Sequence, residues 1–125
     1  MSGEKNTNSI ELLSCPQGGE KCADHLREIN TYMEHSRDMF ECKDFLNCLN
    51  MLVRAHEISF NMSQGFCVKC ADLFRELILK SISNLIAELK RLTTGFFSRK
   101  KYIPIYQYAI ETYDLLKEKE QKSKL

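Results

Sequence analysis

The chain has 125 residues, of which 43% are hydrophobic and 28% are charged, and its formal net charge is +1. This length suits one domain that folds without disulfides, and the composition argues against an intrinsically disordered chain. A net charge so close to zero also argues against a general electrostatic attraction to nucleic acid or to acidic membranes.

The first residues, 1–14, are polar and show little hydrophobic periodicity, which predicts a mobile N-terminal arm ahead of a single helical domain at 15–118. They lack the basic start and apolar centre of a signal peptide, and no later segment holds about 18 apolar residues in a row. We therefore expect a cytoplasmic protein with no membrane association. In a reducing compartment, its six cysteines should be thiols or metal ligands.

The first half of the domain predicts a helical hairpin at 20–62. Apolar residues recur at helical spacing over 20–41 and again over 45–62, and the short connection at Cys42 and Lys43 should make the two helices antiparallel. The expected core positions are Ala23, Leu26, Ile29, Met33, Ser36 and Phe40 in the first helix, and Phe45, Cys48, Leu49, Leu52, Val53, His56 and Phe60 in the second.

A second hairpin is expected at 67–118, after a break at 63–65. Its first helix should be unusually long, about 28 residues, and should end near Gly95. Pro104 suits the first turn of the fourth helix, and residues 119–125 should form a polar tail that frays. The expected core positions are Cys70, Phe74, Leu77, Ser81, Leu85, either Glu88 or Leu89, and Leu92 in the third helix, and Ile105, Ala109, Tyr113 and Leu116 in the fourth.

The two hairpins repeat each other in sequence. KCADHLREI at 21–29 returns 48 residues later as KCADLFREL at 69–77, and a further cysteine precedes each copy. Later in each hairpin, Met39-Phe40 matches Phe96-Phe97 at an offset of 57, which places a nine-residue insertion in the third helix. We therefore expect an internal duplication and an all-α fold of two stacked hairpins, with a closed four-helix bundle as the alternative.

Large and small packing residues of the first hairpin follow the pattern of a helical repeat, at Tyr32, Ser36, Met39, Phe40, Asp44, Phe45, Cys48, Leu49, Leu52 and Ala55. Residues 29–58 thereby resemble a tetratricopeptide repeat. The second hairpin departs from the pattern, because Ile105 and Thr112 stand in the places of Cys48 and Ala55 and the insertion breaks the repeat period. The resemblance implies a helix-turn-helix scaffold that holds partners, and it transfers no catalytic residue.

Four cysteines stand at the openings of the two repeats, Cys15 and Cys22 in the first and Cys67 and Cys70 in the second. A Cys-x-x-Cys pair supplies two zinc ligands from one turn, and stacked hairpins would bring the N-termini of their first helices together. Helix N-termini also favour anionic thiolates. The pattern therefore predicts a structural zinc site on these four residues, with His25 as a substitute for Cys15.

Two other interpretations of these cysteines remain open. Buried thiols can simply pack as small hydrophobic groups, and the pair at Cys67 and Cys70 could act as a redox sensor. Cys48 lies on a predicted core face and is expected only to pack. Neither His35 nor His56 has a partner that the sequence identifies.

A basic cluster at Arg99, Lys100 and Lys101 marks the turn between the third and fourth helices, with aromatic residues beside it. Such a cluster can bind phosphate or nucleic acid, but cations also suit the negative C-terminus of the third helix at a solvated turn. This second interpretation is favoured, because one short cluster at a net charge of +1 is a weak sign of nucleic-acid binding, which we therefore do not expect. Nothing in the sequence pairs a nucleophile with a base. We expect a non-enzymatic module that binds a protein partner or associates with itself, with anion or nucleic-acid binding and thiol redox sensing as alternatives.

Overall fold

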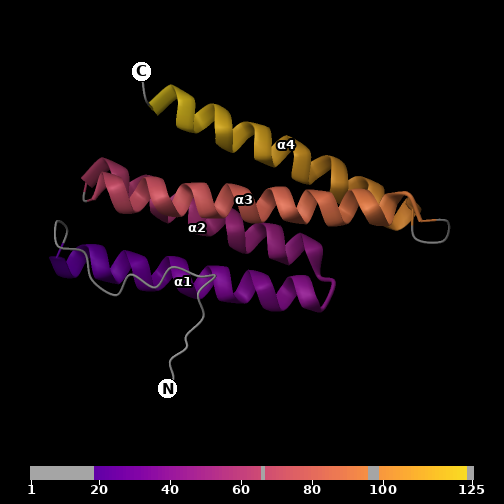
Figure 1. Cartoon of the computed structure of the whole chain (residues 1–125), viewed down its shortest axis with the longest axis horizontal. Helices are drawn as coiled ribbons and strands as arrows, with labels where there is room; N and C mark the ends of the chain where they lie inside the picture. The colour runs from indigo at the N-terminus through magenta and orange to yellow at the C-terminus, as the bar shows by residue number, and fades with distance from the viewer. Residues whose placement is uncertain (1–18, 66, 96–98, 124–125) are drawn as a thin grey trace.

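The computed structural model describes residues 19–65, 67–95 and 99–123, which form four helices (Figure 1). These are α1 (Gly19–Glu41), α2 (Phe45–Gly65), α3 (Val68–Thr93) and α4 (Arg99–Ser123), and this part of the chain contains no strand. The predicted all-α class with four helices is confirmed. The expected N-terminal arm at 1–14 lies outside the described residues.

Two helix boundaries differ from those expected. Helix α2 continues through the expected break to Gly65, and α4 begins at Arg99 with Pro104 inside it. The early start of α4 follows from Tyr102, which is 7% exposed and packs edge-on against Phe45 with ring centroids 5.6 Å apart. Burial of this ring holds the turn ahead of Pro104 in the helix, although proline removes one backbone hydrogen bond there.

The α1–α2 connection is fixed by backbone hydrogen bonds at the end of α1. The amide of Asp44 donates to the carbonyl of Met39 at 2.8 Å, and the amide of Lys43 donates to that of Phe40 at 3.0 Å, which is the Schellman pattern. Asp44 then caps α2, since its carboxylate accepts from the amide of Asn47 at 3.4 Å. Lys43 has φ 65°, a left-handed conformation that disfavours side chains with a Cβ.

Replacing Lys43 with glycine is therefore expected to stabilise the protein by about 1 kcal/mol, because glycine adopts this conformation without the Cβ clash. Thermal denaturation should show a higher midpoint for Lys43→Gly. Lys43→Ala is the matched control, because it removes the same charge but keeps a Cβ. A gain for alanine equal to that for glycine would show that charge, and not backbone conformation, limits stability at this turn.

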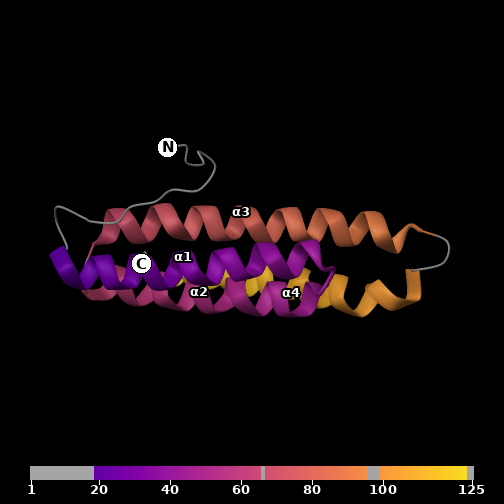
Figure 2. The same cartoon turned by 90° about the horizontal axis from the view of Figure 1, so that it is seen from below.

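The four helices form an open array. Each helix packs chiefly on the next one along the chain, and α1 and α4 make no contact within the described residues. Figure 1 shows α1 and α4 on opposite edges, while α2 and α3 overlap there and separate in the turned view of Figure 2. Of the two expected arrangements, the helices adopt stacked hairpins and do not close into a bundle. The duplication inferred from the sequence stays a prediction.

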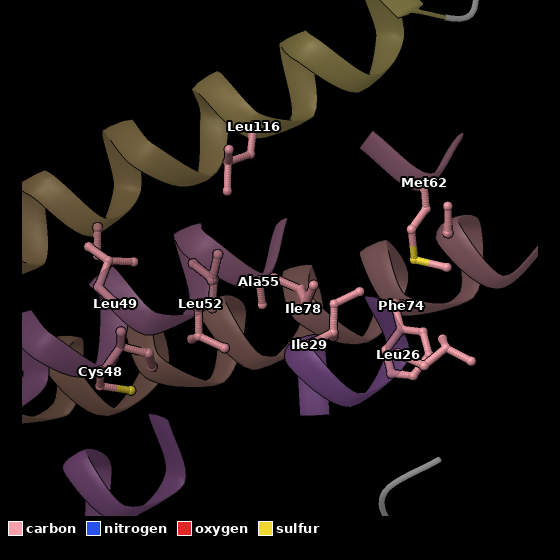
Figure 3. Close-up of a cluster of buried hydrophobic side chains, with 14 of the residues drawn as sticks. Leu26, Ile29, Cys48, Leu49, Leu52, Ala55, Met62, Phe74, Ile78 and Leu116 are labelled. Atoms are coloured by element: carbon pink, nitrogen blue, oxygen red, sulfur yellow. The ribbon is translucent and has the colours of Figure 1, made fainter. Parts of the chain in front are cut away.

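The core runs between the two central helices and is closed by the edge helices. Leu26 and Ile29 of α1 point into the same cluster as Phe74 and Ile78 of α3, and all four side chains are fully buried (Figure 3). The buried face of α3 differs from the expected one at two positions. Ile78 and Ile82 are fully buried, whereas the expected core residues Leu77 and Ser81 are only partly buried. Contacts with both α2 and α4 widen the buried face of α3.

The α3–α4 end extends past the α1–α2 turn in both views (Figures 1 and 2). This follows from the lengths of the helices, because α3 has 26 residues and α4 has 25, against 23 for α1 and 21 for α2. The predicted long third helix therefore carries the second hairpin beyond the first. None of the described helices combines the length and the apolar character that crossing a membrane requires.

Candidate metal centre

Cys67 is the N-cap of α3. Its backbone is extended, with φ −112° and ψ 109°, and its Sγ accepts a hydrogen bond from the amide of Cys70 at 3.4 Å. This bond uses one of the amides that a helix leaves unpaired at its start. The amide and the helix dipole place partial positive charge beside the sulfur, which suits a metal-bound cysteine.

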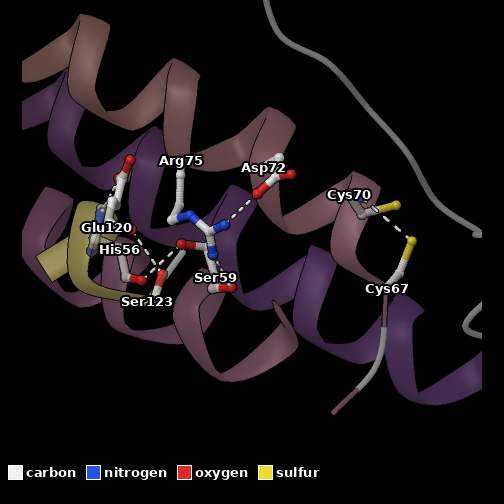
Figure 4. A network of polar contacts seen from close by, with 8 residues as sticks. All are labelled: His56, Ser59, Cys67, Cys70, Asp72, Arg75, Glu120 and Ser123. Atoms are coloured by element: carbon white, nitrogen blue, oxygen red, sulfur yellow. Dashed lines mark hydrogen bonds and ion pairs between the residues drawn. The ribbon is translucent and has the colours of Figure 1, made fainter. Parts of the chain in front are cut away.

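Three thiols meet at the common end of α1 and α3. The Sγ atoms of Cys22, Cys67 and Cys70 all lie within 4.8 Å of one another. Their residues are almost inaccessible, with exposed fractions of 0%, 2% and 8%. Figure 4 shows Cys67 and Cys70 side by side at the start of α3, as a Cys-x-x-Cys pair on one helical turn should be. Cys22 reaches them from α1, 45 residues earlier in the chain.

The fold explains this convergence. Since α1 and α2 form one antiparallel hairpin and α3 turns back along α2, α1 and α3 run in the same direction and start at the same end (Figure 1). Cys22 lies near the start of α1, and Cys67 caps α3. Two helices that are distant in sequence thus place sulfur atoms in one small volume.

These separations fit a thiophilic metal ion. Zinc binds thiolates at about 2.3 Å, which places two sulfurs of a tetrahedral site about 3.8 Å apart. The three thiols therefore need to approach by no more than about 1 Å, a change that side-chain rotation can supply. A group of three buried cysteines can hold a metal ion, and thiolate ligands favour zinc, copper(I) and iron–sulfur chemistry.

Three of the four predicted ligands come together here. The fourth, Cys15, lies outside the described residues. The proposed substitute His25 does not belong to the group, and its Nδ1 lies 3.9 Å from Oε1 of Glu28.

The other two described cysteines stand apart from the cluster. Cys48 is 3% exposed in the core, and burial together with the nearby Asp44 carboxylate raises the pKa of its thiol to about 11. A thiol with this pKa stays protonated and neither binds metal nor attacks a substrate readily. The prediction that Cys48 lies on a core face is confirmed by its burial. Cys42 is exposed at the end of α1, away from the buried group.

A buried polar network that the sequence did not predict lies next to the cluster (Figure 4). His56 of α2 is fully buried, and its Nε2 lies 2.7 Å from Oε2 of Glu120 on α4. Because a carboxylate only accepts, Nε2 carries the hydrogen. Arg75 of α3 donates to the carbonyl of Ser59 at 3.3 Å and also pairs with Asp72. The network thus joins α2 to α4 and to α3.

The sequence held only a weak signal for this network. Residues 119–125 were expected to be a fraying tail, yet α4 continues to Ser123. Most of that stretch is exposed, but Glu120 is only 17% exposed because it turns toward His56. A histidine on the predicted core face of α2 required a polar partner, and only the tertiary arrangement shows which residue supplies it.

Stability should fall in mild acid because of His56. Burial lowers the pKa of its imidazole below the ordinary 6.5, aided by Lys119 and Arg75 and opposed by the hydrogen bond and charge of Glu120. Between the folded-state pKa and 6.5 the unfolded chain binds more protons, so stability is full above that range and is lost as the pH falls through it, by up to about 1.4 kcal/mol per pH unit.

Thermal midpoints measured between pH 8 and pH 5 check this expectation. His56→Gln should flatten the decline below pH 6.5, whereas His35→Gln, which changes an exposed histidine, should preserve it. An equal decline in wild type and His56→Gln would assign the acid sensitivity to other groups.

The basic cluster lies at the opposite end of the molecule from Cys22, Cys67 and Cys70 (Figure 1). Arg99, Lys100 and Lys101 are all exposed in the first turn of α4, which carries no acidic residue. A cavity of about 470 Å³ opens beside them and includes Arg99 among its lining residues, which are Thr93, Thr94, Arg99, Ile103, Tyr106 and Gln107. The ammonium group of Lys101 lies 5.5 Å from the centre of the Tyr102 ring.

Comparisons with protein-family models, with curated proteins and with solved structures found no match to this chain. The likeness of residues 29–58 to a tetratricopeptide repeat therefore stays a resemblance of the packing pattern. The class that the fold and the site define is an all-α array of two hairpins with a buried three-cysteine group between α1 and α3.

Proposed function

We propose that this chain is a non-enzymatic helical module that binds another protein and is stabilised by a structural zinc ion. Cys22, Cys67 and Cys70 supply three ligands, and Cys15 is the predicted fourth. The observation that carries this proposal is the convergence of three buried thiols, from two helices, within 4.8 Å. A structural role fits the burial, because a catalytic zinc ion keeps a position open to water and substrate.

Zinc is the favoured metal on chemical grounds. It is a common ion in structural thiolate sites. Because the ligands come together only in the folded state, zinc binding stabilises the fold. The amide of Cys70 and the start of α3 offset part of the negative charge that three or four thiolates bring together. The thiol redox alternative uses the same pair of cysteines, and metal content distinguishes the two.

The outer face of α4 supports the interaction part of the proposal. Helix α4 is an edge of the open array, and two large apolar side chains are exposed on it, Tyr108 at 47% and Leu115 at 64%. They are seven residues apart and therefore lie on the same face of the helix. Exposed apolar side chains on an edge helix are what a partner helix or a second copy of this chain would cover.

Photocrosslinking in cells tests the interaction directly. A photoreactive amino acid at Tyr108 or Leu115 should give a discrete covalent adduct with one protein, while the same group at Arg54, an exposed position on α2, should not. Sedimentation of the purified chain over a range of concentrations separates self-association from a different partner. Absence of adducts at both α4 positions, or equal labelling at Arg54, would contradict the assignment of this face.

A second function, anion binding, is favoured by one observation. Residues 89–107 contain five basic residues and no acidic one, although the whole chain has 18 basic and 17 acidic residues. Three of these cations stand in the first turn of α4, where the helix dipole is also positive, beside the cavity that Arg99 lines. The negative charge of a phosphate group would offset the repulsion between these positive side chains.

If this end binds phosphate groups, Lys100→Glu should weaken binding of a short fluorescent oligonucleotide about tenfold or more in low salt, and added salt should weaken wild-type binding. Fluorescence anisotropy measures both effects. Lys80→Glu, an exposed change on α3, is the matched control. Binding that is weak in wild type and unchanged in Lys100→Glu would remove this candidate.

A further inference from the structure

Helix α1 is held unevenly along its length. Its last turn is fastened by the α1–α2 connection, where the amide of Asp44 donates to Met39 and the rings of Phe40 and Phe45 pack with centroids 5.6 Å apart. Its first turns have no chain connection to α2 or α3. Among the described residues, α1 packs on α2, touches α3 only slightly and does not reach α4. Among the described residues, the start of α1 thus lacks the fastening that holds its last turn.

Few side chains anchor that end. In the first half of α1, the fully buried side chains are those of Cys22, Leu26 and Ile29, and they follow one another at helical spacing. Leu26 and Ile29 lie in the same buried cluster as Phe74 and Ile78 (Figure 3). Cys22 instead meets the two cysteines of α3. Within the described part of this half of α1, the thiol cluster is a group through which a metal ion could bond the helix to α3.

A metal ion bound at this cluster would link α1 to α3, two helices that are far apart in the sequence. Bonds from Cys22 on one side and from Cys67 and Cys70 on the other would close a loop of 45 residues. A cross-link of this kind acts on the start of α1, because it removes most of the conformations in which that end of the helix is detached. The last turn of α1 is already held in place by the α1–α2 connection.

We propose that metal binding controls the docking of the first half of α1, residues 19–30, onto α2 and α3. This proposal rests on the metal site of the proposed function. With metal bound, α1 covers the apolar side chains of Phe74 and Ile78. When the metal leaves, the first half of α1 detaches and these side chains become accessible, while α2, α3 and α4 stay folded on one another. Cys22, Cys67 and Cys70 thus form a metal-dependent clasp, which holds the first half of α1 against α3 only while metal is bound.

Hydrogen–deuterium exchange of the full reduced chain, with zinc ions or with a chelator, tests this proposal. If the amides of 22–33 exchange through an opening that releases the metal, free zinc at 100 times its dissociation constant should slow their exchange roughly 100-fold. The amides of α3 around Ile82 should change far less. Native mass spectrometry of the same samples counts the zinc bound.

Two variants make the test specific. Cys22→Ser keeps the Cys67 and Cys70 pair but removes the bond to α1, so exchange in 22–33 should become fast and independent of zinc. Cys42→Ser removes an exposed thiol outside the cluster and should keep the wild-type response. The wild-type comparison with chelator needs no substitution, so it stands even if Cys22→Ser folds poorly.

The outcomes separate the two proposals. One zinc ion per chain with no selective slowing in 22–33 would overturn the clasp and leave the structural zinc site intact. Equal acceleration in all four helices on metal removal would also overturn it, because the metal would then control folding of the whole array. Failure to bind zinc at all would refute both the clasp and the metal site.

Discussion

Serine at Cys67 is expected to abolish tight zinc binding while leaving the start of α3 intact. The serine hydroxyl can accept the hydrogen bond that Cys67 Sγ accepts from the amide of Cys70, and serine is a favoured N-cap residue. The hydroxyl is a poor zinc ligand, however, so the variant should lose the metal-linked part of stability. At free zinc 100 times the wild-type dissociation constant, that part is about 2.7 kcal/mol.

Chemical denaturation with and without chelator measures this effect. Cys67→Ser should be less stable than wild type in zinc and nearly equal to it in chelator, whereas Cys42→Ser should match wild type in both. A loss for Cys67→Ser that is the same in zinc and in chelator would show that the thiol contributes by packing alone. A variant that still bound one zinc ion tightly would place the metal elsewhere.

Truncating Phe74 to alanine should produce the second large effect, a loss of about 3–5 kcal/mol. Its ring is fully buried in the core cluster that also holds Leu26 and Met62, so alanine leaves a cavity that the neighbouring helices fill only in part. Against a typical total of about 5–15 kcal/mol, such a loss removes a large fraction of the stability.

Leu115→Ala is the control for this substitution. Leu115 is 64% exposed on α4, so its truncation should change the free energy of unfolding by less than about 0.5 kcal/mol. Urea denaturation compares the two variants. A cost at Leu115 that approaches the cost at Phe74 would mean that the outer face of α4 is buried in solution, which would point to self-association through that face.

Hydrophobic periodicity was sufficient to predict four helices, because each helix buries a stripe at positions three and four residues apart. Leu26, Ile29, Leu49 and Leu52 lie in the core where the pattern put them. The start of α4 differs from the prediction. Pro104 suits a first turn, but Tyr102 packs on the distant Phe45, and the helix begins five residues before the proline.

The thiol cluster was predictable for a different reason. The repeated KCAD motif and the expected stacking of the two hairpins implied that Cys22, Cys67 and Cys70 would meet, and their sulfur atoms do. By contrast, the pair of His56 and Glu120 could not be predicted, since it joins residues 64 apart and one of them lies in a stretch of tail with no apolar pattern. Periodicity identifies faces, but it does not identify which polar residues face each other across helices.

The most direct test of this account is the metal content of wild-type protein purified without chelator, measured by elemental analysis and by native mass spectrometry of the reduced chain. The proposed zinc site predicts one zinc ion per chain, which Cys67→Ser loses and Cys42→Ser retains. If the purified protein contained no metal and added zinc did not raise its thermal midpoint, the proposed zinc site would be wrong. In that case Cys22, Cys67 and Cys70 would be packing residues at the joined starts of α1 and α3.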